Sequence, residues 1–350
     1  MLKKIKIKNI FKSTVIIVLI VFLLFFFLEI LAKNKFNSFL IGSCPYVRIK
    51  NNFDFNLPAK SCKYIFKHWE HNKEIIYETD ELSNRKSTSP INAKKNIIRF
   101  AFFGDSFTWG EMNDSEENYP HYTITNLKKI KKINAGYNNY GVQGYDLLEV
   151  IARMKQVNLT NYDYIVYGLT PNDLFSPQIL NSKKEIDNFE KTSFLKITKK
   201  IKTKNLTSVK VATKFFFDFF PRFYINLYTL RDADLGGYLS INSSAYWNDR
   251  YSELFSQLNG LDEKIRSKLI IQIIAQRVQV QLYNVGDINS AMAFENRVII
   301  ICNQLNIKCN KSQLDELALL KKSHYTVDGH FNSHANFVVG KKLSEFLSDL

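Results

Sequence analysis

Short apolar runs alternate with longer amphipathic stretches from residue 97 to the end of the chain. Each run is too short for a core helix and is typical of a buried strand. Four runs predict four strands, at 97–103, 133–137, 162–168 and 268–274. Because strands that alternate with helical patterns indicate a parallel sheet, we expect an α/β domain over 96–350.

The stretches between these runs carry helix signals. Glu116 and Pro120 precede apolar positions with helical spacing, which favours a helix start. One-sided apolar patterns predict further helices at 147–154, 288–305 and 336–347. An insertion at about 175–245 lacks this order, and its lysine-rich block at 199–204 precedes an aromatic block at 215–220. That combination suits either an anionic membrane surface or a helical insertion packed on the domain.

The N-terminal residues predict a membrane anchor. Residues 14–32 are broken only by Glu29, and as a helix of 19 residues they would span roughly 28 Å, close to a hydrocarbon core of about 30 Å. The lysine-rich tail at 1–13 is expected to stay in the cytoplasm, with everything after the single span outside it. A cleaved signal peptide is the alternative, although its apolar core is usually about 7–15 residues long and no Ala-x-Ala site follows here.

Candidate chemistry follows the first predicted strand. A glycine lets the chain turn there, and Ser106 would project its hydroxyl from the edge of the sheet. A serine nucleophile needs a base, an acid that orients the base, and donors for the oxyanion. Candidates for these roles lie downstream at Gly141, Asn172, Asp328 and His330. The alternative is that Ser106 or Asp105 only caps a helix.

The order of these residues resembles that of the SGNH (GDSL-type) hydrolases. The resemblance implies a three-layer sandwich with a central, mostly parallel, flavodoxin-like sheet. It implies that Ser106 is the nucleophile, and that its backbone N–H forms the oxyanion hole with Gly141 and Asn172. His330 would then be the base, oriented by Asp328, although one residue separates these two where the family usually has two.

The resemblance runs from about residue 97 to the C-terminus, with the insertion unmatched. It implies supporting roles for Asp105 and Asp173. Of the neighbouring histidines at 324, 330 and 334, only the second has a carboxylate two residues upstream. Residues 77–85 are similar to a segment that membrane-tethered members carry before the first strand. We therefore predict that 33–95 is a linker folded against the domain, with a solvated loop as the alternative.

These features together predict a membrane-anchored, extracytoplasmic serine esterase or O-acyl(acetyl)transferase that acts on cell-envelope glycan esters. A lipid or thioester hydrolase and a catalytically inactive binding module with the same fold are the alternatives. No Gly-x-Ser-x-Gly motif is present, which argues against the nucleophile elbow of the α/β-hydrolases. The chemistry requires no cofactor.

Composition adds limits to this picture. The formal net charge is +15, but the lysines are spread rather than striped with arginine, so nucleic-acid binding is not expected. The hydrophobic share of 45% is ample for one large core. Four cysteines lie on the predicted exported side, at Cys44, Cys62, Cys302 and Cys309. Three disulfide pairings or free thiols are possible, no metal-binding spacing occurs, and the oligomeric state is not indicated.

Overall fold

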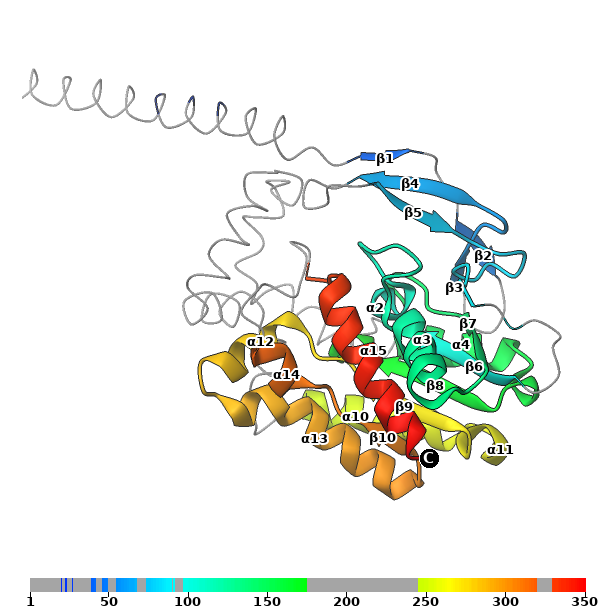
Figure 1. Ribbon diagram of the computed structural model, residues 1–350. Coiled ribbons are helices and arrows are strands. Elements are labelled where there is room, and N and C mark those ends of the chain that lie inside the picture. Colours follow the sequence, from blue (N-terminus) through cyan, green and yellow to red (C-terminus); the bar gives the residue numbers. More distant parts are fainter. Residues whose placement is uncertain are drawn as a thin grey trace, which may run out of the picture.

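The computed structural model shows a central sheet flanked by helices, with a smaller sheet formed by residues ahead of it (Figure 1). The residues that the structure describes are 20, 23, 27, 39–41, 46–49, 55–67, 74–89, 91, 97–174, 245–319 and 329–350. Of the insertion predicted at about 175–245, residues 175–244 therefore lie outside the described residues.

The central sheet has five strands, and all of its strand pairs are parallel. In chain order they are β6 (Ile98–Gly104), β7 (Ala135–Asn139), β8 (Tyr164–Leu169), β9 (Leu269–Ile273) and β10 (Lys308–Asn310). Their spatial order is β7-β6-β8-β9-β10, so the chain reverses direction across the sheet at β6. Ligands of open parallel sheets bind at such a switch point, beyond the carboxyl ends of the strands.

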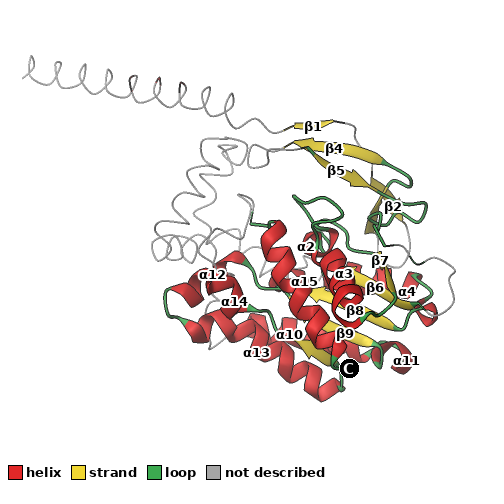
Figure 2. Ribbon diagram, viewed as in Figure 1, coloured by secondary structure: helices red, strands yellow, loops and turns green. Residues whose placement is uncertain are grey.

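Helices cover both faces of this sheet, as Figure 2 shows. The long ones are α3 (Tyr119–Lys131), α4 (Leu147–Gln156), α10 (Ala245–Asn259), α13 (Ile288–Leu305) and α15 (Ser333–Ser348). The β6-α3-β7 and β7-α4-β8 connections run in opposite directions along the sheet. Right-handed crossovers then put α3 and α4 on opposite faces. Helix α15 packs on α3, while α10 packs on α13 and α4, which completes three layers.

Short helices connect these elements. They are α2 (Ser106–Trp109), α11 (Glu263–Arg266), α12 (Arg277–Asn284) and α14 (Leu314–Leu319), with 3₁₀ turns η1 (Leu159–Asn161) and η2 (Pro171–Leu174). Helices α2, η2 and α12 follow the carboxyl ends of β6, β8 and β9. They therefore lie at the edge of the sheet where a ligand is expected.

The core follows from strands that are buried on both faces. Phe102 of β6 is fully buried, and its ring makes edge contacts with Tyr119 of α3 and Tyr137 of β7, at centroid distances of 6.0 and 5.7 Å. Phe103, on the other face of the same strand, stacks on Tyr140 at 4.8 Å. Because side chains alternate between the two faces, a strand buried on both sides needs a nearly continuous apolar run. The sequence has such a run at 97–103, interrupted only by Arg99 near its start.

The predicted elements of the domain agree closely with the observed ones. Strands β6, β8 and β9 lie within two residues of their expected bounds, and α13 has the expected bounds. Helix α15 begins three residues earlier than expected because the Asn332 side chain caps it, accepting from Ala335 N at 3.0 Å.

The region predicted as a linker contains strands. They are β1 (Phe39–Ile41), β2 (Tyr46–Ile49), β3 (Phe55–Pro58), β4 (Lys63–Lys67) and β5 (Ile75–Glu78). The first, fourth and fifth form an antiparallel sheet, and the other two form a hairpin. Residues 74–89, which we call the extension, reach the free edge of β7: Ser89 O accepts from Tyr137 N at 3.0 Å, and Arg85 pairs with Asn139 in an antiparallel bridge.

The predicted anchor lies outside the described residues apart from three positions. Ile20, Leu23 and Phe27 are helical, and each is at least half exposed. Within the described part of the chain, no helix has the length and apolar character needed to cross a membrane, and no cluster of side chains could hold a metal ion. A disulfide joins Cys302 of α13 to Cys309 of β10, and Cys62 is also disulfide-bonded.

Candidate active site

Ser106 lies at the point where β6 ends and α2 begins. Gly104 has a φ of +149°, and a Cβ there would lie 2.8 Å from Gly168 O of the neighbouring strand, so only glycine fits this turn. The Asp105 side chain caps α2 by accepting from Phe107 N at 2.9 Å. The turn therefore presents a half-buried Ser106 beyond the carboxyl end of the sheet.

His330 reaches Ser106 from the other end of the sequence. Its Nε2 lies 2.7 Å from Ser106 Oγ, across 224 positions of the chain. The imidazole packs on the Phe107 ring at a centroid distance of 5.1 Å, and Phe331 meets the same ring edge-on at 4.9 Å. When Nε2 carries no proton, it accepts the serine O–H, which is the arrangement that a hydroxyl nucleophile needs.

Asn172 lies in η2, directly after β8, and is exposed at the same edge. Its Nδ2 donates to Asp105 Oδ2 at 3.0 Å, and its Oδ1 accepts from Gln276 Nε2. Because an amide nitrogen carries two hydrogens, one N–H of Asn172 stays available to a ligand oxygen. The two hydrogen bonds fix the direction of that N–H.

The backbone N–H of Gly141, which was expected to face the oxyanion, has another partner in the structure. Gly141 is buried, and its N–H donates to Asn139 Oδ1 at 3.0 Å rather than being available to a ligand oxygen. A Cβ on it would lie 2.6 Å from Trp109 N, so glycine is required for close packing against α2. Gly144, three residues on, is exposed with a φ of +76°, and its N–H makes no hydrogen bond among the described residues.

Two carboxyl groups lie fully buried behind Ser106. The Thr170 hydroxyl contacts both, at 3.2 Å from Asp105 Oδ2 and 2.8 Å from Asp173 Oδ1. One hydroxyl has a single hydrogen to donate, so Thr170 can donate to only one of these two carboxyl groups at a time. Burial, together with the charge of Asp105, raises the pKa of Asp173 well above its ordinary value.

Burial raises the pKa of Asp105, while its hydrogen bonds from Asn172 and Phe107 and the nearby His330 counteract that shift. Asp105 links the cap of α2 to the Asn172 amide, and Asp173 accepts from the Tyr167 hydroxyl at 3.0 Å. The supporting roles of Asp105 and Asp173 stay predictions.

The structure brings Ser106, His330, Asn172 and Asp105 together, while Asp328 lies outside the described residues. The role of Asp328 stays a prediction. Sequence reasoning missed Gln276 and Thr170. Thr170 follows the carboxyl end of β8, and Gln276 follows the carboxyl end of β9. Polar residues at these strand ends are expected near a ligand, so their positions could have identified them.

No protein-family model matches this sequence, and no curated protein matches it either. Among solved structures, it is similar to a lipolytic protein of the G-D-S-L family from Veillonella parvula, with 14% identity over 72% of this chain and 100% of that chain and a TM-score of 0.40. An acetylxylan esterase from Geobacillus stearothermophilus matches with 13% identity over 73% and 96% of the two chains and a TM-score of 0.41. A two-domain esterase active on acetylated mannans matches with 13% identity over 72% and 49% and a TM-score of 0.39. These likenesses are too distant to decide the chemistry, so the proposal below rests on the contacts of Ser106.

Proposed function

We propose that this chain is a serine esterase or O-acyltransferase of the SGNH type. The observation that carries the proposal is the 2.7 Å contact between Ser106 Oγ and His330 Nε2, at the carboxyl edge of a parallel sheet. A helix-capping serine needs no imidazole beside it, whereas a nucleophile does. The exposed amide of Asn172, held in direction by Asp105 and Gln276, adds a donor at the same edge.

The reaction proceeds in two steps. His330 Nε2 accepts the Ser106 proton while Oγ attacks the ester carbonyl, and the imidazolium then gives that proton to the departing alkoxide. The Ser106 N–H, the free N–H of Asn172 and the N–H of Gly144 are the donors proposed for the oxyanion, with Gly144 in place of Gly141. A water molecule or a sugar hydroxyl then attacks the acyl-enzyme, with His330 as general base.

The proposed location is the outer face of a membrane. The apolar stretch at 14–32 and the lysines before it support an anchor with the active site outside the cytoplasm. The Cys302–Cys309 disulfide agrees with an oxidising compartment. A tethered site reaches substrates that are attached to the same envelope, so the proposed substrates are acyl esters of cell-envelope glycans, with acetyl as the first acyl group to test.

A fluorophosphonate probe tests the chemistry, because it forms a covalent bond only with an activated serine. We expect the full-length protein to be labelled, and Ser106→Ala and His330→Ala to lose labelling while keeping the wild-type unfolding temperature. Absence of labelling in the folded wild type would favour the binding-module alternative. Acetate release from acetylated envelope polysaccharides tests the substrate class, and preference for long-chain p-nitrophenyl esters would favour the lipid hydrolase instead.

A further inference from the structure

The loop that follows α2 holds a strained conformation close to the catalytic serine. Gly110 ends the helix with a φ of +84°, and the buried Met112 has a φ of +64°. A left-handed conformation at a side chain such as that of methionine costs on the order of 1 kcal/mol and persists only where the surroundings fix it. Contacts from two distant parts of the chain do so here.

The first set of contacts joins this loop to the segment of His330. Asn113 is 1% exposed, and its Nδ2 donates to Phe331 O at 2.7 Å and to Glu111 O at 2.7 Å. Both hydrogens of the amide are used, so Asn113 clamps the loop after Ser106 to the residue next to His330. The chain after Ser106 and the chain at His330 are therefore joined twice. One link is the Ser106–His330 contact itself, and the other is the hydrogen bond from the Asn113 side chain to the backbone carbonyl of Phe331.

The second set of contacts comes from the extension. The Tyr77 hydroxyl accepts from Met112 N at 2.8 Å, and an Arg85 N–H donates to Asn113 O at 2.8 Å. The Arg85 guanidinium is buried and lies over the rings of Tyr77 and Trp109, at 4.4 and 5.2 Å from their centroids. The extension thus holds both the strained residue and the clamp residue of the loop.

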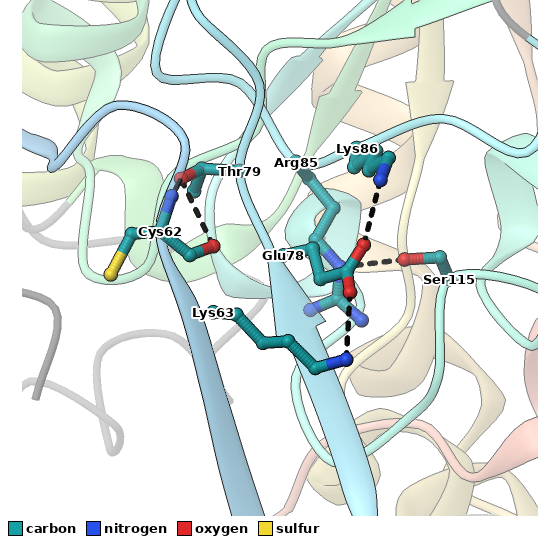
Figure 3. A network of polar contacts seen from close by, with 7 residues as sticks. All are labelled: Cys62, Lys63, Glu78, Thr79, Arg85, Lys86 and Ser115. Carbon is teal, nitrogen blue, oxygen red and sulfur yellow. Dashed lines mark hydrogen bonds and ion pairs between the residues drawn. The ribbon is translucent and has the colours of Figure 1, made fainter. Parts of the chain in front are cut away.

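The extension is itself anchored on its outer side. Figure 3 shows Glu78 between Lys63 and Lys86, with nitrogen–oxygen distances of 3.1 and 3.0 Å, and Arg85 directed toward Ser115. These exposed ion pairs contribute little energy. The β4–β5 pairing sets the register that directs Tyr77 toward the loop.

We propose that Asn113 is a positioning residue for His330, and that the extension completes the active site by holding Asn113 in place. This inference rests on the proposed function, and it makes a segment outside the α/β domain part of the catalytic unit. The imidazole also packs on Phe107, so we expect the loss of Asn113 to displace His330 rather than to release it. A misplacement of about 1 Å at a reacting group can cost on the order of 100-fold in rate.

Two substitutions test the clamp in the full-length protein. Asn113→Asp keeps the shape of the side chain but removes the N–H donors. Its matched control is Asn310→Asp, since Asn310 is also buried and donates to Gln272 Oε1, on a strand three positions from β6. Tyr77→Phe removes one hydroxyl and keeps the ring, and its control is Tyr162→Phe, a buried tyrosine at the amino end of β8.

The first readout is hydrolysis of p-nitrophenyl acetate. We expect Asn113→Asp to lower kcat by about 10- to 100-fold with little change in KM, because the imidazole is displaced while the ester site is kept. Tyr77→Phe is expected to lower kcat by a smaller factor, also with little change in KM. If Asn113→Asp does not fold, the kcat of Tyr77→Phe tests the inference instead. The two controls are expected to keep the wild-type kcat.

The second readout needs no turnover. Diethyl pyrocarbonate modifies accessible imidazoles, and mass spectrometry gives the rate at His330 relative to the exposed His334. We expect this ratio to rise in Asn113→Asp and Tyr77→Phe and to stay constant in both controls. Wild-type ratios and wild-type kcat in both clamp variants would overturn the inference, as would an equal loss in Asn310→Asp. A wild type without turnover would count against the proposed function alone, since the ratio still reports the position of His330.

Discussion

Replacement of Gly141 by alanine tests whether close packing against α2 sets the position of the nucleophile. The added Cβ would lie 2.6 Å from Trp109 N and 2.8 Å from the Thr108 carbonyl carbon. Carbon contacts are favourable from about 3.5 Å, so the two backbones must separate by about 1 Å. Because both clashing groups are backbone, no side-chain rotation can relieve them, and α2 must move together with Ser106.

We expect Gly141→Ala to lose about 1–3 kcal/mol of unfolding free energy, the usual cost of overpacking. Displacement of Ser106 by about 1 Å would also lower the rate of fluorophosphonate labelling by up to about 100-fold. Urea unfolding and labelling rates on the same preparation measure the two effects. Alanine keeps the backbone N–H, so loss of a donor at this position does not explain either effect.

Gly340→Ala is the matched control for this experiment. Its Cβ would lie 2.5 Å from Tyr122 Cβ and 2.8 Å from Tyr119 O, where α15 meets α3. We expect a comparable loss of stability with a labelling rate close to that of the wild type. A Gly141→Ala protein with reduced stability but an unchanged labelling rate would refute the link between this contact and Ser106.

Three further outcomes are expected. Because burial raises the folded-state pKa of Asp173, the folded protein holds this proton more tightly than the unfolded chain, and stability falls as pH rises, by up to about 1.4 kcal/mol per pH unit. Asp173→Asn should flatten that slope in urea unfolding above about pH 4, where the unfolded chain has lost this proton, and parallel slopes would contradict the assignment. Loss of the Cys302–Cys309 disulfide, which closes a loop with a sequence separation of 7, should cost about 2 kcal/mol, measured by urea unfolding of Cys309→Ser beside the wild type without reductant, because a reductant would also break the disulfide of Cys62; an unchanged midpoint would count against it. Gln276→Ala frees the Asn172 amide to rotate, so kcat for p-nitrophenyl acetate should fall about 10-fold, and wild-type kcat would show that Asp105 alone suffices.

The central sheet could be predicted from sequence because its strands are buried on both faces. A short apolar run such as 97–103, interrupted only by Arg99 and followed by a glycine, favours a buried strand over a core helix. Helix α12 was missed for the opposite reason: Val278, Val280 and Leu282 alternate with polar residues, a pattern typical of a strand, yet the Gln276 capping box starts a helix there. The strands that the structure describes within 33–95 are at most five residues long, which is too short for a periodic pattern to be recognised.

The site could be predicted only as far as topology determines it. Ser106 and Asn172 follow β6 and β8, whose carboxyl ends lie at one edge, so their convergence follows from the parallel order. His330 precedes α15, and its place at that edge was expected from the chemistry rather than from the strand order. The choice between Gly141 and Gly144 depends on where the Asn139 side chain points, which no local pattern encodes. The Asn113–Phe331 hydrogen bond joins residues 218 positions apart and is equally invisible in the sequence.

The pairing of Arg85 and Ser89 with β7 has a practical consequence for anyone who trims the protein to its α/β part. A version that begins at residue 96 would leave the backbone N–H and C=O groups of Tyr137 and Asn139 uncovered along a bare strand. Such an edge is a template for another chain, and aggregation is the expected result. A version cut ahead of residue 39 keeps that edge sealed and also retains the sheet of β1, β4 and β5 that holds the extension.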